Sequence, residues 1–201
     1  MYFFTSDIHF NDPEIIKMER RPFRTCEEFN RFVIELWNKQ AGKGDTIFVI
    51  GDFLDCDNAD SSLWKTSIDY PKHLEADVVL ITGNNEERVI KSFFGGDFEK
   101  FREECLNNGF KDVKPSDDIC FGGHEFHLVH KPMHYKAGVL NLFGHSHRAG
   151  GLYMPFGFNI GCDLHHFHLV SEDDILYYIE TKHQYWDNDP NLLLRFENRK
   201  N

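Results

Sequence analysis

Two short pairs of residues have the types and the spacing that bind metal ions. Asp7 and His9 are separated by one residue, and so are His145 and His147. In an extended segment residues i and i+2 point to the same side, so each pair would present two ligands in one direction. The two pairs therefore predict a site that holds a cation.

Three further polar residues, Asp52, Asn84 and His130, also follow short apolar segments. A glycine precedes Asp52, Asn84 and His145. Because glycine has no Cβ, the backbone can turn sharply there and come close to a bound group. Loops at strand ends form the usual ligand crevice of α/β sheets. We therefore expect all seven residues to converge on one site.

The donor atoms of these residues indicate the class of metal. They offer two carboxylates, four imidazoles and one amide oxygen, without a thiolate. This set suits borderline or hard ions, and we predict two divalent ions, Mn²⁺ foremost, with Fe²⁺, Zn²⁺ or Ni²⁺ as alternatives. One ion does not normally take seven ligands from protein. Two ions roughly 3.5 to 4 Å apart, bridged by one carboxylate, would use them all, and this spacing is typical of phosphate-ester chemistry.

The elements that must position these residues alternate between strand and helix in the first half of the chain. We predict strands around Phe3 and Phe4 and over residues 46–50 and 78–81. Thr25 and Glu28 fit the capping-box pattern for an amphipathic helix that ends at Gln40. Further helices are predicted over residues 86–94 and 98–107. Short strands are predicted over residues 119–121, 125–129, 140–143, 157–160 and 175–179.

The change from strand–helix alternation to short strands indicates more than one sheet. A single sheet with so many short late strands would leave edges exposed. We therefore predict an α/β fold of the four-layer αββα sandwich type, with two mixed sheets face to face and helices outside. The chain is interpreted as a single domain over residues 1–201, in which residues 164–201 form a C-terminal strand and extension.

Composition limits the classes of protein that the chain can belong to. It has 201 residues, of which 41% are hydrophobic and 27% charged, and its net charge is -11. This composition is that of a globular protein, and no apolar run is long enough to predict a membrane span. The acidic balance counts against general binding to nucleic acid. The N-terminus lacks the pattern of a signal peptide, so we expect a cytoplasmic protein.

Five motifs in succession resemble the calcineurin-like metallophosphoesterases. They are D-x-H at residue 7, G-D-x-x-D at residue 51, G-N-x-[DE] at residue 83, a single His at residue 130, and G-H-x-H at residue 144. The motifs frame about 70% of the chain. The segments at residues 4–10, 21–23 and 158–163 are similar to a small bacterial and phage branch of that family.

The resemblance implies a ligand assignment and a reaction. One metal would be held by Asp7, His9, Asp52 and His147, and the other by Asp52, Asn84, His130 and His145. Asp52 would bridge the two ions. A hydroxide between the ions would attack phosphorus in line with the leaving oxygen. Asp55 and Glu86 would orient the ligands rather than bind metal.

One position departs from the family pattern. Members that cleave diesters efficiently have a His after the motif asparagine, which contacts the phosphate and can protonate the leaving group, and here that residue is Asn85. The amide can still donate a hydrogen bond, but it cannot supply a proton. We expect hydrolysis of esters with good leaving groups to be favoured. His134, four residues after His130, is a candidate for the acid, and a solvated loop histidine is the alternative.

Two arginines near the motifs could bind substrate phosphate. Arg21 follows the first motif, and Arg148 directly follows His147. Each could bind a phosphate through two hydrogen bonds. Arg21 could equally pair with the acidic start of the following helix.

These observations predict a metal-dependent phosphohydrolase, foremost a phosphodiesterase. The alternatives are a catalytically weak or inactive scaffold that binds protein partners, and a phosphomonoesterase or nucleotide hydrolase that uses the same metals. The expected partner is a phosphate-ester small molecule or a nucleotide. No membrane partner is expected, charge does not favour nucleic acid, and the sequence gives no oligomeric state.

Overall fold

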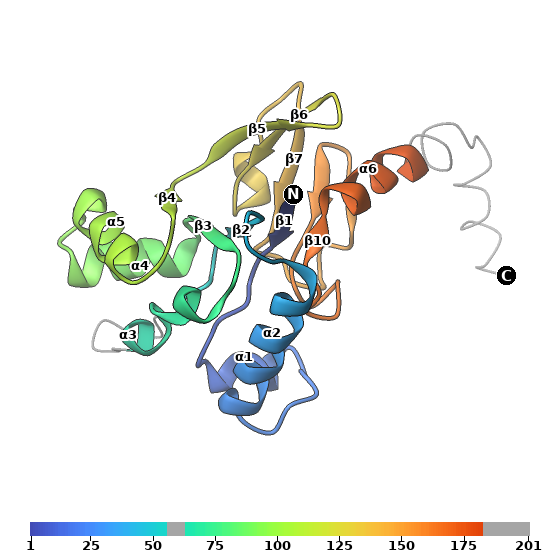
Figure 1. The fold of residues 1–201 in the computed structure, drawn as a ribbon. Helices are drawn as coiled ribbons and strands as arrows, with labels where there is room; N and C mark the ends of the chain where they lie inside the picture. Colours follow the sequence, from blue (N-terminus) through green and yellow to red (C-terminus); the bar gives the residue numbers. More distant parts are fainter. Residues whose placement is uncertain (56–62, 183–201) are drawn as a thin grey trace, which may run out of the picture.

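The computed structural model describes residues 1–55 and 63–182, and the fold is built around two mixed sheets (Figure 1). The last part of the predicted C-terminal extension, residues 183–201, lies outside the described residues. The first sheet has the strand order β10-β1-β2-β3-β4. Its strands are β1 (Tyr2–Thr5), β2 (Thr46–Ile50), β3 (Asp77–Ile81), β4 (Asp112–Lys114) and β10 (Val170–Ser171). Strands β1 to β4 run parallel, and β10 is antiparallel to β1.

Helices from the first half of the chain cover one face of this sheet. They are α1 (Pro13–Met18), α2 (Cys26–Gln40), α3 (Leu63–Ser67), the 3₁₀ turn η1 (Tyr70–His73), α4 (Asn84–Phe93) and α5 (Phe98–Asn107). Alternate strand residues such as Ile47, Val49 and Leu80 share a core with buried residues of these helices. The helix α2 begins as predicted, since the Thr25 side chain accepts a hydrogen bond from the Glu28 N–H.

The second sheet has the order β5-β6-β7-β9-β8 and packs on the other face of the first. Its strands are β5 (Asp117–Phe121), β6 (His124–Leu128), β7 (Leu140–Phe143), β8 (Tyr153–Met154) and β9 (Gly157–Asn159). Phe4, Phe48 and Ile50 of the first sheet share one core with Leu142 and Phe158 of the second. The turn η2 (Pro132–His134) follows β6. The prediction of an α/β fold with two mixed sheets and flanking helices is confirmed.

One predicted element is wrong in type. Residues 175–179 were expected to form a strand, but they lie in the helix α6 (Glu172–Thr181). A capping box begins this helix: the Ser171 hydroxyl accepts from the Asp174 N–H, and the Asp174 carboxylate accepts from the Ser171 N–H. Ile175 and Ile179 are four residues apart and therefore lie on the same face of the helix, which packs against the core between the sheets.

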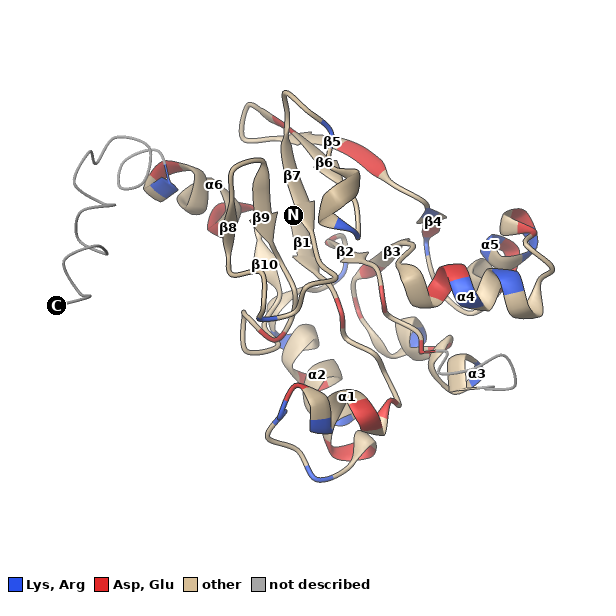
Figure 2. Cartoon of the chain, turned by 180° about the vertical axis from the view of Figure 1, so that it is seen from behind, with Lys and Arg blue, Asp and Glu red and all other residues tan. Residues whose placement is uncertain are grey.

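Charged residues of both signs are mixed along the elements (Figure 2). The helices α4 and α5 carry acidic and basic segments side by side, and β5 carries acidic residues. None of the described helices and strands is predominantly basic, so no element forms a basic surface against the net charge of -11. Within residues 1–55 and 63–182, none of the helices combines the length and apolar character needed to cross a bilayer.

Candidate metal centre

The candidate ligands follow the carboxyl ends of parallel strands in both sheets. Asp7 and His9 follow β1, Asp52 follows β2, and Asn84 begins the helix after β3. In the second sheet, His130 follows β6, and His145 and His147 follow β7. A parallel bridge between Ser6 and Gly161 joins the strand ends of the two sheets. Topology thus brings the polar loops of both sheets to one place.

The seven residues form a ring of contacts, which we call the ligand ring. The His145 N–H donates to both carboxylate oxygens of Asp7 (3.0 Å each), and His145 Nδ1 lies 2.8 Å from Asn84 Oδ1. Asn84 Oδ1 is 3.1 Å from His130 Nε2, which is 3.4 Å from Asp52 Oδ2. Two longer contacts, together with the stacked imidazoles of His9 and His147 (ring centroids 5.5 Å apart), complete the ring.

These two contacts join the remaining histidines to the carboxylates. His9 Nε2 lies 3.7 Å from Asp52 Oδ2, and His147 Nε2 lies 4.0 Å from Asp7 Oδ1. Ligand atoms of Asp7, His9 and His147 lie within 4.8 Å of one another, as do those of Asp7, Asp52 and His130. Atoms bound to one ion at about 2.1 Å can be no more than about 4.2 Å apart, so the atoms of either group need to move little to share one ion.

The backbone at the ligands differs from the expectation. Asp7, His9, Asp52, His145 and His147 all have positive φ, between 44° and 70°. The two pairs are therefore not in extended segments, although each pair does converge on the site. For residues other than glycine the left-handed conformation costs roughly 1–2 kcal/mol each. Such strain persists only where the surrounding structure over-determines it, and it concentrates at functional sites.

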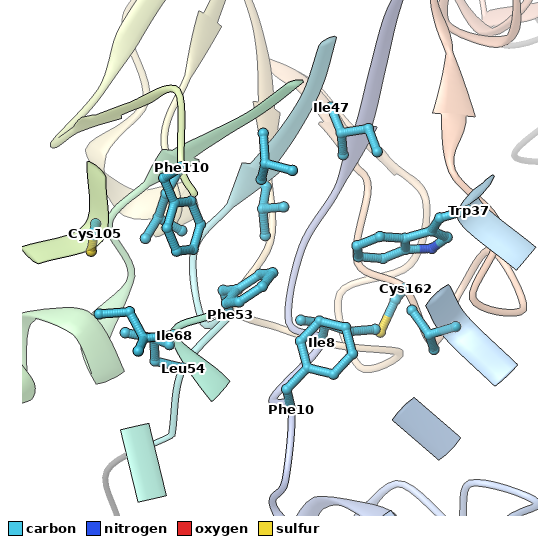
Figure 3. Packing of buried hydrophobic residues seen from close by; sticks show 14 of the residues in the cluster. Ile8, Phe10, Trp37, Ile47, Phe53, Leu54, Ile68, Cys105, Phe110 and Cys162 are labelled. Carbon is cyan, nitrogen blue, oxygen red and sulfur yellow. The ribbon is translucent and has the colours of Figure 1, made fainter. Parts of the chain in front are cut away.

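Buried apolar neighbours hold these strained loops in place. Ile8, Phe10 and Phe53, which adjoin the ligands in sequence, are completely buried. They pack beneath the loops in the core of the first sheet, where the rings of Phe10 and Phe53 are 4.9 Å apart (Figure 3). Ligands thus alternate along the chain with these buried apolar residues. Because each apolar neighbour is fixed in the core, the ligand beside it is directed toward the site.

Two glycines are required by close approach to the ligands. Gly51 has a φ of 85°, and a Cβ at this position would overlap the His130 ring. A Cβ at Gly144 would overlap the Ser6 hydroxyl and meet an Asp7 oxygen at 2.5 Å. At both positions the absence of a Cβ lets the backbone lie close to a side chain of the ring, His130 at Gly51 and Asp7 at Gly144.

Glu86 organises the loop that carries Asp52. Its buried carboxylate accepts four backbone N–H groups, from Asp52 (2.9 Å), Phe53 (3.0 Å), Leu54 (2.9 Å) and Gly83 (2.7 Å). Burial and the nearby Asp52 charge raise the pKa of Glu86, and the backbone donors oppose that rise. With all its oxygens facing the backbone, Glu86 has the geometry of a group that orients a ligand.

His9 supplies a direct test of whether the ring fits a metal. Within the described residues, His9 Nε2 is buried and has no hydrogen-bond partner. An unpaired buried nitrogen is costly, and a metal ion at this point would satisfy it. The neighbours of the other ring nitrogen, Nδ1, are the Asn85 amide nitrogen at 3.2 Å and Asp55 Oδ1 at 4.0 Å. The donors present, with His9 Nε2 left unpartnered, therefore fit a divalent ion.

The electrostatics of the ring favour positive charge. Burial alone would raise the pKa of Asp52, but the hydrogen bond from His130 and its charge hold that pKa below the usual range. Burial alone would lower the pKa of His130, yet Asp52 raises it to about 9. His130 Nδ1 is 2.9 Å from the carbonyl of Ile50, which fixes a proton there and leaves Nε2 directed to the ring.

The structure places the two candidate groups for leaving-group chemistry differently. Asn85 is 3% exposed, and both ends of its amide are engaged: Nδ2 lies 3.2 Å from His9 Nδ1, and Oδ1 accepts from Arg88 at 3.0 Å. His134 is exposed on η2, and within the described residues no contact is recorded between its imidazole and the ligand ring.

Both predicted substrate arginines are paired with a carboxylate of the protein. The Arg21 side chain is fully buried and pairs with Asp163, so the expectation that it binds substrate does not fit its placement. Arg148 is exposed and binds Glu19, through the carboxylate (Nε–Oε2 3.2 Å) and the backbone carbonyl. The charge of each is partnered within the protein.

Two residues that contact the site were not predicted. Asp163 follows β9 and lies 2.9 Å from His147 Nδ1, and Arg21 and His147 lower its pKa to about 2 although burial alone would raise it. Arg88 lies one helical turn after Asn85, and that spacing in the sequence could have indicated the contact. No local spacing could have indicated Asp163, because its partners are distant along the chain.

Comparisons with known proteins give the family of the chain and relatives of its fold. The family model for calcineurin-like phosphoesterases matches residues 2–198. An uncharacterised protein of Methanocaldococcus jannaschii is 31% identical over 127 residues, which are 63% of this chain but only 56% of that relative. A solved Aquifex aeolicus protein of unknown function has a TM-score of 0.63 at 20% identity, covering 89% of this chain and 98% of that one. An archaeal phosphodiesterase is more distant, with a TM-score of 0.47 at 16% identity over 80% of this chain and 81% of that one.

Proposed function

The chain belongs to the calcineurin-like phosphoesterase family, a family of metal-dependent hydrolases of phosphate esters, and from this premise we propose that it is a two-metal phosphodiesterase. The observation that carries the proposal is the ligand ring, because two carboxylates, four imidazoles and an amide converge in contact. Five of these seven residues have a left-handed backbone, whereas only four other non-glycine residues of the described chain do.

We assign one divalent ion to each side of the ring. One position is formed by Asp7, His9, Asp52 and His147, and the other by Asp52, Asn84, His130 and His145. Asp52 lies between the two groups, within 3.4 Å of His130 and 3.7 Å of His9. Two ions bound there, with Mn²⁺ as the proposed metal, would lower the pKa of a water for attack on phosphorus and neutralise phosphate charge.

The ring's surroundings support a preference for good leaving groups. The Asn85 amide cannot release a proton, and the guanidinium of Arg88 beside it donates a hydrogen bond to the amide oxygen. These two groups can stabilise negative charge, but neither can protonate a departing alkoxide. Since general acid catalysis is worth about 10² to 10⁴ in rate, alkyl diesters should be hydrolysed slowly. His134 remains the proposed donor for whatever protonation does occur.

The proposed substrates are phosphate-ester small molecules or nucleotides. The acidic net charge and the mixing of both charge signs on the described elements give no support to a long duplex as substrate. Phosphomonoester or nucleotide hydrolysis by the same ring is the alternative activity. The single-domain organisation and cytoplasmic location expected from the sequence remain proposals as well.

Parallel assays on the Mn²⁺-loaded protein test this function. A nitrophenyl phosphodiester, a dinucleotide and a nitrophenyl monoester would be compared, with Asp52→Asn as the inactive variant and Asp112→Asn as a matched control far from the ring. We expect the nitrophenyl diester to be hydrolysed at least 100-fold faster than the dinucleotide. Equal rates on both diesters would overturn the leaving-group proposal. A faster monoester would favour the alternative activity, and no hydrolysis at all would favour a scaffold.

A further inference from the structure

We propose that the buried pair Arg21 and Asp163 positions the ligands Asp7 and His147 and thereby sets the affinity of one metal position. The proposal rests on the proposed two-metal function. It gives a role to two residues that the ligand assignment leaves out. Both would act through the ligands they hold, without touching substrate.

The guanidinium of Arg21 joins three segments of the chain. Its Nε and Nη2 donate to the two oxygens of Asp163, each at 2.9 Å. Nη1 donates to the carbonyl of Ile8 and Nη2 to the carbonyl of Asp7, both at 2.7 Å. The side chains of Arg21 and Asp163 are 0% and 3% exposed. A planar group with several fixed donors can make these bonds together, whereas a lysine ammonium cannot reproduce the fork.

Asp163 extends this network to a candidate ligand. Its Oδ2 lies 2.9 Å from His147 Nδ1, so the imidazole proton is held on Nδ1. The lone pair of His147 Nε2 then faces Asp7, whose Oδ1 is 4.0 Å away. The carboxylate of Asp163 therefore fixes both the tautomer and the ring orientation that ligation needs.

The same network acts on the backbone at the ligands. Asp7 has a φ of 59° and His147 a φ of 44°, conformations that residues other than glycine hold only under constraint. Arg21 binds the Asp7 carbonyl, and the Cys162 thiol donates to it as well, at 3.2 Å. The rings of Phe29 and Phe167 lie 4.8 and 5.6 Å from the guanidinium carbon and keep it from water. Removing the pair would release the strain that places these ligands.

Arg21 and Asp163 contact the ligands of only one of the two proposed metal positions. Arg21 and Asp163 contact Asp7 and His147, which belong to one proposed metal position. On the other position, Asn84 and His130 are held by contacts within the ring and by the Ile50 carbonyl, and the His145 imidazole lies against Asn84 while its backbone N–H donates to Asp7. A buried ion pair that only stabilised the fold would affect both positions alike. Selective weakening of one ion thus separates a positioning role from a structural one.

Metal binding by Asp163→Asn and Arg21→Lys tests the proposal. Mn²⁺ would be titrated by calorimetry and counted per chain after desalting, with electron paramagnetic resonance to distinguish a coupled pair from an isolated ion. Asp112→Asn, which breaks the Arg102 pair at 2.7 Å, is the control. We expect each of these two variants to bind one ion about 10- to 100-fold more weakly and the other within about threefold of wild type. The control should bind both ions normally.

Distinct results would overturn the inference and the proposed function. If the folded variants bind both ions as wild type does, or lose both equally, the positioning role is refuted. If wild type itself binds fewer than two ions, the two-metal function fails, whatever the variants do. Folding is checked by circular dichroism, and Arg21→Lys, which keeps the charge, decides the question should Asp163→Asn not fold.

Discussion

Replacing Glu86 by Gln tests how the loop of Asp52 is held. The carboxylate accepts four buried backbone N–H groups, two on each oxygen: Phe53 and Leu54 on Oε1, Asp52 and Gly83 on Oε2. The amide of Gln has one oxygen, so two of these N–H groups would face an NH₂ whichever way it is turned. An unsatisfied buried donor costs about 1–3 kcal/mol, and the expected loss of stability is therefore about 2–6 kcal/mol.

Urea unfolding at neutral pH, followed by circular dichroism and extrapolated linearly to water, measures this loss. Glu87→Gln is the matched control, because Glu87 is the next residue on α4 and its side chain is 55% exposed beside Lys131. A surface ion pair contributes about 0–1 kcal/mol, so the control should change little. A cost below about 1 kcal/mol for Glu86→Gln would refute the reasoning, since it would mean that Glu86 is already protonated or that its four bonds contribute nothing.

Three further predictions concern the ring and its rim. Arg88→Ala should raise KM for a phosphodiester about 10-fold while kcat falls less, because the guanidinium beside Asn85 pairs with no carboxylate among the described residues and can bind phosphate. Lys91→Ala, one turn further along α4, should leave both constants unchanged. Steady-state kinetics that show equal effects of the two substitutions would contradict this prediction. His130 has a pKa raised to about 9 and must lose its proton to bind metal. The affinity for Mn²⁺ should therefore rise about tenfold for each pH unit between about pH 6 and pH 8. Calorimetry that finds an affinity independent of pH would contradict the assignment of His130 as a ligand. His134→Ala should slow the dinucleotide selectively and spare the nitrophenyl diester, and unchanged rates on both would exclude His134 as the proton donor.

Much of the fold could be predicted from the pattern of apolar residues. Where that prediction fails, the cause lies in the local sequence. Residues 46–50 and 98–107 form the predicted strand and helix at the predicted bounds. In both segments the spacing of the apolar residues and the polar residues at the ends indicate the same element. Residues 175–179 are rich in β-forming types, but the capping box at Ser171 and the spacing of Ile175 and Ile179 select a helix. In this segment the cap at the helix N-terminus outweighs the β-propensity of the residues that follow it.

The site illustrates a different limit. Convergence of Asp7, His9 and the other ligands could be predicted, since all follow apolar segments, but the extended backbone assumed for the pairs is in fact left-handed. That conformation depends on packing beneath the loops and on the glycines beside them. The burial of Arg21 could not be inferred either, because its partner Asp163 lies 142 residues away in the chain. Local spacing identifies chemistry, whereas long-range pairing decides which charges remain available for substrate.

The most direct test of the central claim is the hydrolysis rate of a nitrophenyl phosphodiester measured against the number of Mn²⁺ ions bound per chain. If the ligand ring holds two ions that act together, the rate should stay low up to one ion per chain, rise toward the second and level off at two. Full activity with a single ion, or no activity with two ions bound, would contradict the account.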